Sequence, residues 1–391
     1  MTPAARIAAA IGVLEGILAG APAEKLLTTW ARRNRYAGSS DRAAIRDLVF
    51  DALRRRRSFG WLGGADSGRG LMIGLLRAAG TDPDTLFTGE RYAPPPLEEV
   101  ERETRPLDRA PLPVRLDCPD WLWPLLWRDF GADCAPLLRS LQKRAPVFLR
   151  VNRRRADTDR ALAALAAEGI VARPHSLAGT ALEVVGNARR IRHSAAYGQG
   201  LVELQDAASQ AVVEALRPED GQTVLDYCAG GGGKSLALGA LARLKLTAHD
   251  RDPGRMADLP ARARRAGISV EIADSGALSG RRFDLVLCDV PCSGSGSWRR
   301  APQGKWLLDP ARLAALEQEQ SAILHAAAGH VRPGGRLAHV TCSLLRGENE
   351  ERVEAFLAAS PGWVERMRRR WSPLQGGDGF FLSVLERVRG D

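Results

Sequence analysis

Two cysteines lie about fifty residues apart in the sequence, each just after an apolar run. Cys292 follows residues 283–288, and Cys342 follows residues 336–340. In a doubly wound α/β sheet, ligands bind at the carboxyl ends of the strands, so we expect both thiols to face one cleft. A thiolate is a soft nucleophile suited to adding at carbon 6 of a pyrimidine, and this addition makes carbon 5 electron-rich enough to attack an electrophilic methyl group. The pair therefore predicts covalent chemistry on a base.

Asp289 ends the first of these runs. Its carboxylate could bond the ring nitrogen or the amino group of cytosine and stabilise the charge that develops on addition. A second thiol nearby could assist the later release, when the carbon 5 proton leaves and the bond to the enzyme breaks. A free cysteine is more often a small buried hydrophobe, and we assign Cys288, inside its apolar run, to that role. The chemistry of the residues alone does not rank Cys292 and Cys342.

A glycine-rich turn precedes these cysteines. Residues 226–234 read Asp-Tyr-Cys-Ala-Gly-Gly-Gly-Gly-Lys, which predicts a strand, a turn and a helix start that bring the backbone close to a nucleotide-like cofactor. A phosphate-binding P-loop would need a glycine five positions before Gly233, where this chain has Cys228. Asp250 follows the next predicted strand and is suited to bonding ribose hydroxyls. Asp274 follows the third and could accept from an adenine amino group, although a turn role is slightly favoured for it.

The elements that position these residues alternate from residue 201 onward. Apolar runs predict strands and the stretches between them predict helices, which is typical of a mostly parallel sheet. The helices are expected at 253–266, 310–329 and 349–358 and from 236 onward, and the strands at 223–227, 246–249, 270–272, 283–288, 336–340 and 380–388.

The first 200 residues differ in character. Apolar residues at helical spacing, such as Ile7, Ile11, Leu14 and Leu18, predict helices over residues 1–135, with a Pro-rich loop or linker at 93–113. Three nearby tryptophans are expected to pack in a core, the alternative being stacking on bases: Trp121, Trp123 and Trp127. Residues 140–200 predict a small α+β module. Its arginines lie near strand ends and either meet phosphates or form a solvated surface: Arg150, Arg153, Arg154, Arg155, Arg189, Arg190 and Arg192.

The bulk composition sets limits on partners and compartment. The 391 residues are enough for two or three domains, and the net charge of +10 favours a polyanionic partner such as nucleic acid, an anionic membrane surface being the alternative. No apolar run approaches the roughly 20 residues that cross a bilayer, and no signal peptide opens the chain. The six cysteines form no CxxC pair, so a structural zinc site is not expected. We expect a cytoplasmic protein with reduced thiols.

Taken together, these motifs resemble the RsmB/Sun family of S-adenosylmethionine-dependent RNA (cytosine-5) methyltransferases. The resemblance covers the C-terminal half and is weaker in residues 140–200, and residues 41–55 resemble the NusB-like domain of RsmB proteins. It rests on the glycine turn and on the following segments: Gln-Asp-Ala-Ala-Ser-Gln at 205–210, Pro-Cys-Ser-Gly at 291–294, Arg-Arg-Ala-Pro at 299–302 with Lys305 and Trp306, Thr-Cys-Ser at 341–343, and Gly-Asp-Gly-Phe-Phe at 377–381.

The resemblance implies an α/β fold, with a Rossmann-like class I methyltransferase domain over 201–391. A helical NusB-like RNA-binding domain over 1–135 and a small α+β RNA-binding module over 140–200 would precede it. The resemblance implies that Cys342 is the nucleophile and that Cys292 assists release. It also implies that these residues line the S-adenosylmethionine site: Cys228, Ala229, Gly230, Gly231, Gly232, Gly233, Lys234, Asp250, Asp274 and Asp289.

The implied activity is methylation of carbon 5 of a cytosine in small-subunit (16S) ribosomal RNA by a cytoplasmic monomer. A transfer RNA substrate is an alternative, and so is an RNA-binding assembly or antitermination factor with a weakened methyltransferase half. Two departures from the family pattern bear on this. Gly230 and Gly231 replace the usual alanine and proline, which makes the turn looser and could weaken cofactor binding. Ala301-Pro302-Gln303 replaces the usual His-Pro-Asp, which puts a local substrate contact in doubt.

Overall fold

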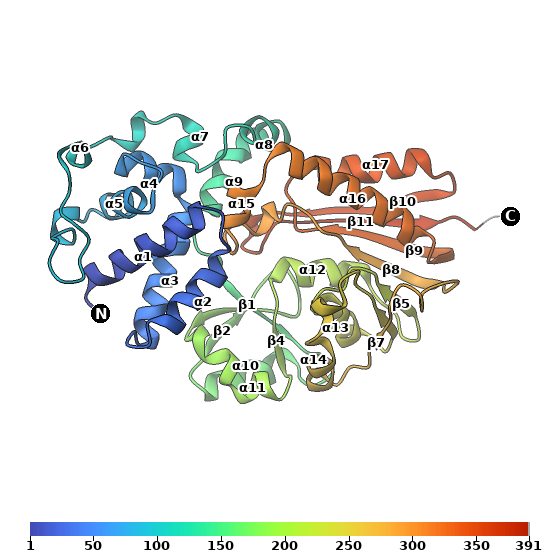
Figure 1. Ribbon diagram of the computed structural model, residues 1–391. Helices are drawn as coiled ribbons and strands as arrows, with labels where there is room; N and C mark the ends of the chain where they lie inside the picture. Colours follow the sequence, from blue (N-terminus) through green and yellow to red (C-terminus); the bar gives the residue numbers. More distant parts are fainter. Residues whose placement is uncertain (390–391) are drawn as a thin grey trace. The chain divides into compact units, whose positions relative to one another are not determined.

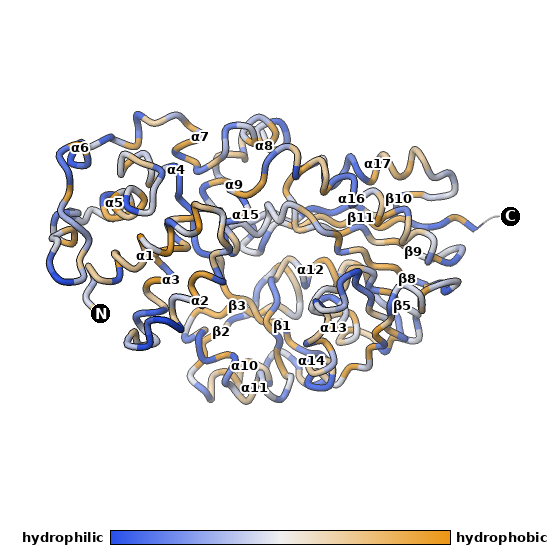
Figure 2. Tube along the Cα trace, in the orientation of Figure 1, coloured by the Kyte–Doolittle hydropathy of each residue, from blue (hydrophilic) through white to orange (hydrophobic). Residues whose placement is uncertain are grey.

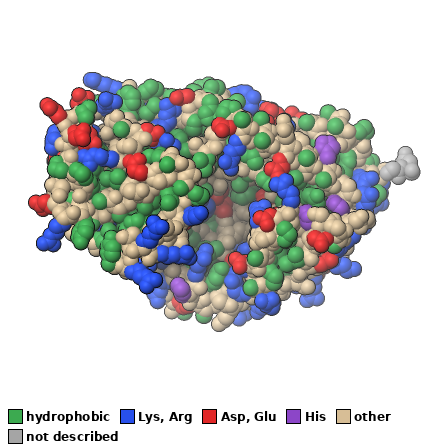
Figure 3. Space-filling view, in the orientation of Figure 1, with side chains coloured by type: hydrophobic (Ala, Val, Ile, Leu, Met, Phe, Trp, Pro, Cys, Tyr) green, Lys and Arg blue, Asp and Glu red, His purple; other side chains and the backbone are tan. Residues whose placement is uncertain are grey.

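The computed structural model describes residues 1–389 and divides into two compact units (Figure 1). One unit, here called the helical unit, comprises Met1–Arg144 together with Trp298–Asp309. The other, here called the sheet unit, comprises Ala145–Ser297 and the chain from Pro310 onward. The sequence predicts one uninterrupted domain over 201–391, whereas in the structure residues 298–309 belong to the helical unit. Figure 3 shows Lys and Arg side chains in blue over the surface of both units.

The helical unit is built around five helices that share one apolar core. Their inward residues include Leu14, Ile45, Leu53 and Leu71, all at most 1% exposed. Helices α4 and α5 approach closely because glycines face each other, and a Cβ at Gly74 would lie 1.9 Å from the Phe59 carbonyl oxygen. The helices of residues 1–144 are α1 (Pro3–Leu18), α2 (Ala23–Arg33), α3 (Ser39–Arg54), α4 (Arg56–Gly63), α5 (Gly68–Ala78), α6 (Glu99–Arg102), α7 (Leu112–Arg115), α8 (Trp123–Phe130) and α9 (Cys134–Leu141), with short 3-10 turns at Pro83–Thr85, Leu107–Arg109 and Gly131–Asp133.

Two details of the helical unit differ from expectation. The Pro-rich stretch expected to be a loop contains the short helices α6 and α7. The tryptophans are only partly in the core: Trp121 and Trp123 are half-buried, Trp127 is 49% exposed, and the rings of Trp123 and Trp127 lie with centroids 5.5 Å apart. The reason is that α8 is short and buries mainly Leu126, so the tryptophans lie at the edge of the core.

Residues 298–309 complete the helical unit. They include α15 (Gln303–Leu307), and Trp298 is only 2% exposed. The Trp306 Nε1 donates to the Leu53 carbonyl at 2.6 Å, and the Gln303 side chain accepts from the Ala23 backbone N–H at 2.9 Å. Lys305 is 2% exposed, and burial lowers its pKa to about 8. These contacts show that the segment is an internal part of the helical fold.

The sheet unit begins with a four-stranded antiparallel sheet in the order β2-β3-β1-β4. One face of it packs on α10 through residues such as Leu149 and Leu165, and the other joins the core around α12 through Phe148 and Ala181. The small module and the larger sheet therefore share a core. Its elements are β1 (Val147–Val151), α10 (Thr158–Ala167), β2 (Val171–Pro174), β3 (Ala181–Gly186), a 3-10 turn at Ala188–His193, α11 (Ala195–Gly198) and β4 (Val202–Leu204).

The larger sheet has seven strands in the order β10-β11-β9-β8-β5-β6-β7. The strands from β9 to β7 run parallel, and β11 and β10 are antiparallel additions at one edge. This confirms the mostly parallel sheet predicted from the sequence. Its elements are α12 (Ala207–Leu216), β5 (Thr223–Asp226), α13 (Gly233–Leu241), β6 (Lys245–Ala248), α14 (Leu259–Ala266), β7 (Glu271–Ile272), β8 (Phe283–Asp289), α16 (Pro310–Ala328), β9 (Val331–Thr341), α17 (Glu350–Ala359), β10 (Trp363–Trp371) and β11 (Phe380–Arg387), with 3-10 turns at Pro253–Met256, Ser295–Ser297, Arg346–Glu348 and Pro373–Gln375.

Successive residues of the central strands face opposite sides of the sheet, as strand geometry requires. In β8, Leu285 and Leu287 join the core with α12 and α13, whereas Val286 and Cys288 join the core with α16 and α17. The orange segments of Figure 2 follow these buried strands. Cys288 is fully buried, as predicted. Among residues 1–389, no helix combines the length and the apolarity that a membrane crossing requires.

Two predicted elements were inexact. The helix expected over 253–266 is a 3-10 turn followed by α14, because Pro260 in the first turn of α14 starts a new helix. The strand β10 was not predicted, since its sequence is rich in charge.

Candidate active site

The two cysteines follow neighbouring parallel strands. Asp289, the last residue of β8, lies opposite Val340 of β9, so the loops that follow these strands leave the sheet side by side. The Sγ atoms of Cys292 and Cys342 are 3.5 Å apart, and both thiols are free and partly buried. The Gly296 backbone N–H donates to the Cys342 carbonyl at 2.9 Å and links the loops further. The structure therefore brings together the two thiols that the sequence singled out.

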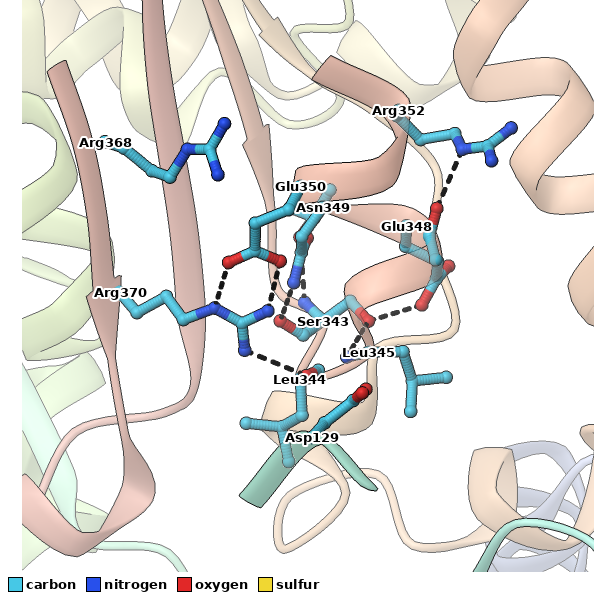
Figure 4. Close-up of polar contacts among 12 residues, drawn as sticks. Asp129, Ser343, Leu344, Leu345, Glu348, Asn349, Glu350, Arg352, Arg368 and Arg370 are labelled. Carbon is cyan, nitrogen blue, oxygen red and sulfur yellow. Dashed lines mark hydrogen bonds and ion pairs between the residues drawn. The ribbon is translucent and has the colours of Figure 1, made fainter. Parts of the chain in front are cut away.

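A fully buried carboxylate, Glu348, links the two cysteine loops. It accepts hydrogen bonds from the Ser293 backbone N–H at 2.7 Å and from the hydroxyls of Ser293 and Ser343, the residues that follow Cys292 and Cys342 (Figure 4 shows the Ser343 bond). Gln320 of α16 donates to the same carboxylate at 3.0 Å and to the Pro291 carbonyl at 2.9 Å. The Glu348 carboxylate thus accepts hydrogen bonds from both cysteine loops and from α16.

The Cys342 loop has further supports. The Asn349 side chain donates to the Ser343 carbonyl at 2.9 Å and accepts from the Thr341 hydroxyl at 2.5 Å. Figure 4 shows the ion pair of Arg370 with Glu350. The Arg370 guanidinium also donates to the Leu344 carbonyl at 3.1 Å. The backbone around Cys342 is therefore held by hydrogen bonds on both sides.

An ion pair lies beside the thiols. Lys234 Nζ is 2.6 Å from Asp289 Oδ2, and it lies 4.9 Å from the centroid of the Phe380 ring. Burial lowers the pKa of Lys234, but the charge of Asp289 and its hydrogen bond outweigh burial and raise the pKa. A fixed ion pair therefore lies at the carboxyl end of β8.

Cys292 has a different environment. Its hydrogen bond with Cys342 and its burial raise its pKa well above the usual value, and the charge of Glu348 adds to the effect. Its thiolate form is therefore disfavoured.

The glycine turn lies between β5 and α13, as expected. Gly230 and Gly232 adopt positive φ angles of 50° and 76°, a conformation that glycine adopts without penalty. The Gly230 backbone N–H donates to Asp250 Oδ2 at 2.9 Å, which connects the turn with the acidic residue that follows β6. Arg255 pairs with the same carboxylate oxygen at 3.1 Å.

The start of α13 is held by residues from the small module. Arg150 donates to the Gly233 carbonyl at 3.0 Å and to the Gln205 side chain at 2.5 Å, and the Gln205 amide donates to the same carbonyl at 3.2 Å. Arg150 is only 3% exposed, and burial lowers its pKa to about 10. It therefore faces neither solvent nor a phosphate, so both options considered for it are wrong.

Two other predicted residues have simpler surroundings. Asp274 is exposed, and its carboxylate accepts from the Ala277 backbone N–H at 2.8 Å, the contact expected of a turn residue. Cys228 is partly buried, and burial together with the charges of Asp226 and Asp250 raises its pKa. Ala229 continues the turn, and its backbone N–H donates to the His249 carbonyl at 2.8 Å.

Neither Glu348 nor the role of Arg150 as a support of the glycine turn was predicted from the sequence. Glu348 lies in Arg-Gly-Glu-Asn-Glu, a charged stretch that is typical of a solvated helix start. Arg150 lies among other arginines near a strand end. The sole signal for Arg150 is its place inside an apolar run, where alternation turns every second side chain inward.

Comparison with family models agrees with this architecture. Residues 213–385 match the model described as 16S rRNA methyltransferase RsmB/F. Residues 118–189 match the ferredoxin-like domain of RsmF/B-like methyltransferases. Residues 190–212 separate the two matches, which together span most of the sheet unit.

Curated relatives cover most of the chain. Ribosomal RNA small subunit methyltransferase B of Klebsiella pneumoniae subsp. pneumoniae is 31% identical over 341 residues, which are 82% of this chain and 73% of that protein. The protein of the same name from Vibrio vulnificus is 33% identical over 281 residues, 68% of this chain and 66% of that one.

Solved structures share the fold. The crystal structure of PH0851 has a TM-score of 0.79 at 22% identity and covers 99% of both chains. NSun6 from Pyrococcus horikoshii, solved with SFG, has a TM-score of 0.61 at 17% identity and covers 70% of this chain and 99% of that one. The fold and the strand-end site define a Rossmann-like methyltransferase. The chain belongs to the RsmB family of S-adenosylmethionine-dependent methyltransferases.

Proposed function

We propose that this protein methylates carbon 5 of a cytosine in small-subunit ribosomal RNA through a covalent bond to Cys342. The observation that carries the proposal is the 3.5 Å approach of the Cys292 and Cys342 sulfurs at neighbouring strand ends, beside the Lys234–Asp289 pair. Family membership supports methyl transfer, and the names of the curated relatives support ribosomal RNA as the substrate and therefore the cytoplasm as the site of action. We propose that the protein acts as a monomer.

The residues around the glycine turn fit S-adenosylmethionine. Gly230 and Gly232 keep backbone, rather than side chains, at the carboxyl end of β5, and Asp250 places a buried carboxylate at the end of the adjacent strand. Three of the four acceptor positions of that carboxylate are used, by the backbone N–H groups of Gly230 and Asp252 and by the Arg255 guanidinium, and the remaining one lies on Oδ1. We propose that residues 228–234, Asp250, Asp274 and Asp289 line this site. When bound, the cofactor supplies an electrophilic methyl group.

The two thiols would divide the work. The Cys342 thiolate would attack carbon 6 of the cytosine. A bond forms between Cys342 Sγ and carbon 6, and carbon 5 would then take the methyl group from the cofactor, whose sulfur leaves as a neutral thioether. For release, water acting as a base would take the carbon 5 proton, the electrons of that bond would re-form the carbon 5–carbon 6 double bond, and the Sγ–carbon 6 bond would break to restore the Cys342 thiolate. Cys292 is placed to act in this release, since its Sγ lies 3.5 Å from the Cys342 sulfur.

The target base must leave its stack to reach thiols that are partly buried. Asp289 would bond the base, as its carboxylate is one-third exposed while one of its oxygens pairs with Lys234.

Cysteine replacement tests the roles. Cys292→Ala should trap a covalent RNA adduct that migrates slowly on a denaturing gel, because addition proceeds but release fails. Cys342→Ala should abolish methyl transfer and adduct formation while S-adenosylmethionine still binds in calorimetry. Cys134→Ala, at a buried cysteine of α9, serves as the control and should behave as wild type.

Other outcomes separate the alternatives. An adduct with Cys342→Ala instead of Cys292→Ala would reverse the two roles. Failure of the wild type to bind S-adenosylmethionine would favour an RNA-binding factor without methyltransferase activity. Mapping 5-methylcytosine in RNA from a deletion strain identifies the substrate, and loss of a transfer RNA site in place of a ribosomal one would overturn the substrate assignment.

A further inference from the structure

Six arginines gather where the turn before α10 meets the loops after α13 and α14. They line two adjoining hollows of about 580 Å³ each, both of which include Arg154 and Arg155. The first hollow also includes Arg153 and Arg243, and the second includes Arg160 and Arg264. Figure 1 shows α10, α11 and α14 together in this part of the sheet unit. We call these six residues the arginine surface.

The charge of the arginine surface is not neutralised by ion pairs. Among residues 1–389, none of the six guanidinium groups lies within 4.0 Å of a carboxylate oxygen, whereas the neighbouring Arg265 pairs with Glu203 at 2.6 Å. Where they bond at all, the partners are backbone carbonyls, as with Arg153 and Gly179 at 2.8 Å. Two acidic residues accept from the backbone of these arginines: Asp220, which lines the first hollow, from the Arg243 N–H at 2.7 Å, and Asp157 from the Arg160 N–H at 2.8 Å. The guanidinium groups therefore keep most of their capacity to bind an anion.

This surface is separate from the cysteines. The loops after α13 and α14 lead into the starts of β6 and β7, so they lie at the amino edge of the parallel strands. Cys292 and Cys342 follow the opposite, carboxyl edge. The two edges are separated by the length of a strand, which is about 15 Å for four or five residues. A ligand of the arginine surface would therefore lie away from the reacting base.

We propose that the arginine surface binds the phosphate backbone of the RNA substrate at a distance from the target cytosine. This inference rests on the proposed function for the identity of the RNA. Guanidinium groups recognise phosphate oxygens with two parallel hydrogen bonds, and several unpaired ones along a hollow fit a chain of phosphates. A membrane fits this surface less well, since the surface is concave and Leu241, 37% exposed, is the large apolar side chain that lines it.

The test replaces three of these arginines. Arg155, Arg243 and Arg264 make no hydrogen bond through their guanidinium groups within residues 1–389, so Gln at all three should leave the thermal midpoint unchanged. Binding of the full chain to in vitro transcribed 16S ribosomal RNA is measured as a function of KCl concentration. We expect at least a tenfold loss of affinity at low salt and a slope of log K against log salt that is smaller by about 2–3, since each phosphate contact contributes about 0.7–0.9.

The matched control removes the same net charge elsewhere. Arg173, Arg281 and Arg366 pair with Glu183, Glu271 and Glu386, and Gln at these three positions should change the slope far less. Lysine at positions 155, 243 and 264 should restore most of the affinity. Equal losses in the two triple variants would overturn the proposal, because they would indicate a general effect of charge.

Two further readouts separate this proposal from others. Vesicles containing phosphatidylserine are tested in parallel, and loss of vesicle binding with unchanged RNA binding would overturn the proposal in favour of a membrane. Because binding is measured without methyl transfer, a wild type that binds RNA through this surface but transfers no methyl group would contradict the proposed function and support the arginine surface. For an active enzyme, the triple variant should raise KM for the RNA and leave kcat unchanged.

Discussion

The carboxylate of Glu348 holds the loops of both cysteines, so its replacement should loosen their contact. In Glu348→Gln, the side chain loses its charge and one acceptor oxygen, while Ser293 and Ser343 keep donors that both need an acceptor. We expect the free energy of unfolding to fall by about 1.5–3 kcal/mol. We also expect slower formation of a Cys292–Cys342 disulfide after addition of diamide, because the sulfurs would spend less time at 3.5 Å.

Disulfide formation is followed by thiol labelling and mass spectrometry, which need no RNA and no cofactor. Glu354→Gln provides the control, since Glu354 is an exposed residue of α17 that pairs with Arg368. If the Glu348→Gln and Glu354→Gln variants formed the disulfide at the same rate, Glu348 would not set the spacing of the cysteines.

Asp226 gives the stability of the sheet unit a pH dependence. Burial raises the pKa of Asp226 to about 7 in the folded protein, and Oδ1 has no hydrogen-bond partner among the described residues. Because this pKa lies above the unfolded value of 3.8, the folded state binds more protons between about pH 4 and 7. The stabilisation is therefore complete below pH 4 and is lost as the pH rises through 7. Asp226→Asn should remove this pH-dependent loss in the free energy of unfolding, which is at most about 4 kcal/mol.

The measurement is the thermal midpoint of Asp226→Asn relative to wild type at pH 5 and at pH 8. The thermal midpoint of the variant, relative to that of wild type, should be higher at pH 8 than at pH 5. The same difference at both values would show that Asp226 does not titrate in this range.

At the scale of the element, the glycine turn combines two kinds of constraint. Gly232 has φ of 76°, and a Cβ there would lie 2.2 Å from Leu259 Cδ1, whose side chain is fully buried. Gly232→Ala should therefore cost about 1–2 kcal/mol in backbone strain and a further 1–3 kcal/mol in repacking. The variant should also bind S-adenosylmethionine more weakly, since α13 begins directly after this residue.

Gly221→Ala isolates the backbone component, because Gly221 has φ of 85° and no atom within 4 Å of its Cβ position. It should lose stability by strain alone and keep the wild-type affinity in calorimetry. Equal effects of the two variants on stability and on affinity would contradict the role given to Leu259. The looser turn inferred from Gly230 and Gly231 stays a prediction that the same calorimetry addresses.

The strands that hold the site could be predicted because their apolar runs are buried on both faces. β5, β8 and β9 are of this kind, and the loops after them were placed correctly. β10 was missed because its arginines pair across an exposed edge, as Arg366 does with Glu386, so the strand lacks an apolar run. Glu348 was missed for a related reason, since its burial depends on donors that come from three separate segments.

At the scale of the whole molecule, the helical unit depends on residues 298–309. The cores around β1, β5, β6 and β8 are formed by residues of the sheet unit, so we expect a fragment of residues 145–391 to fold. In this fragment, Lys305 and Trp306 lack their partners Arg54 and Leu53. Trypsin should therefore cut at Arg299 and Lys305, which are 5% and 2% exposed in the full chain.

Mass spectrometry of timed digests locates the cuts, and the other cleavage sites of the sheet unit serve as the internal control. Equal resistance of residues 298–309 in the fragment and in the full chain would show that the segment does not need the N-terminal helices. No sequence pattern could predict this dependence, because Lys305 and Trp306 lie in the chain between β8 and β9 of the sheet unit, while their contacts are with Arg54 and Leu53.

The discontinuity of the helical unit also has a consequence for biosynthesis. Residues 1–144 leave the ribosome early and contain most of one core, but the position of α15 within that unit stays empty until residue 309 has been translated. By then β1 to β8 and the Cys292 loop have been made, and β9 with Cys342 has not. Domains fold as units during synthesis. The helical unit therefore reaches its final structure in the interval between the emergence of the two cysteines, and the second cysteine joins a chain whose N-terminal part is already complete.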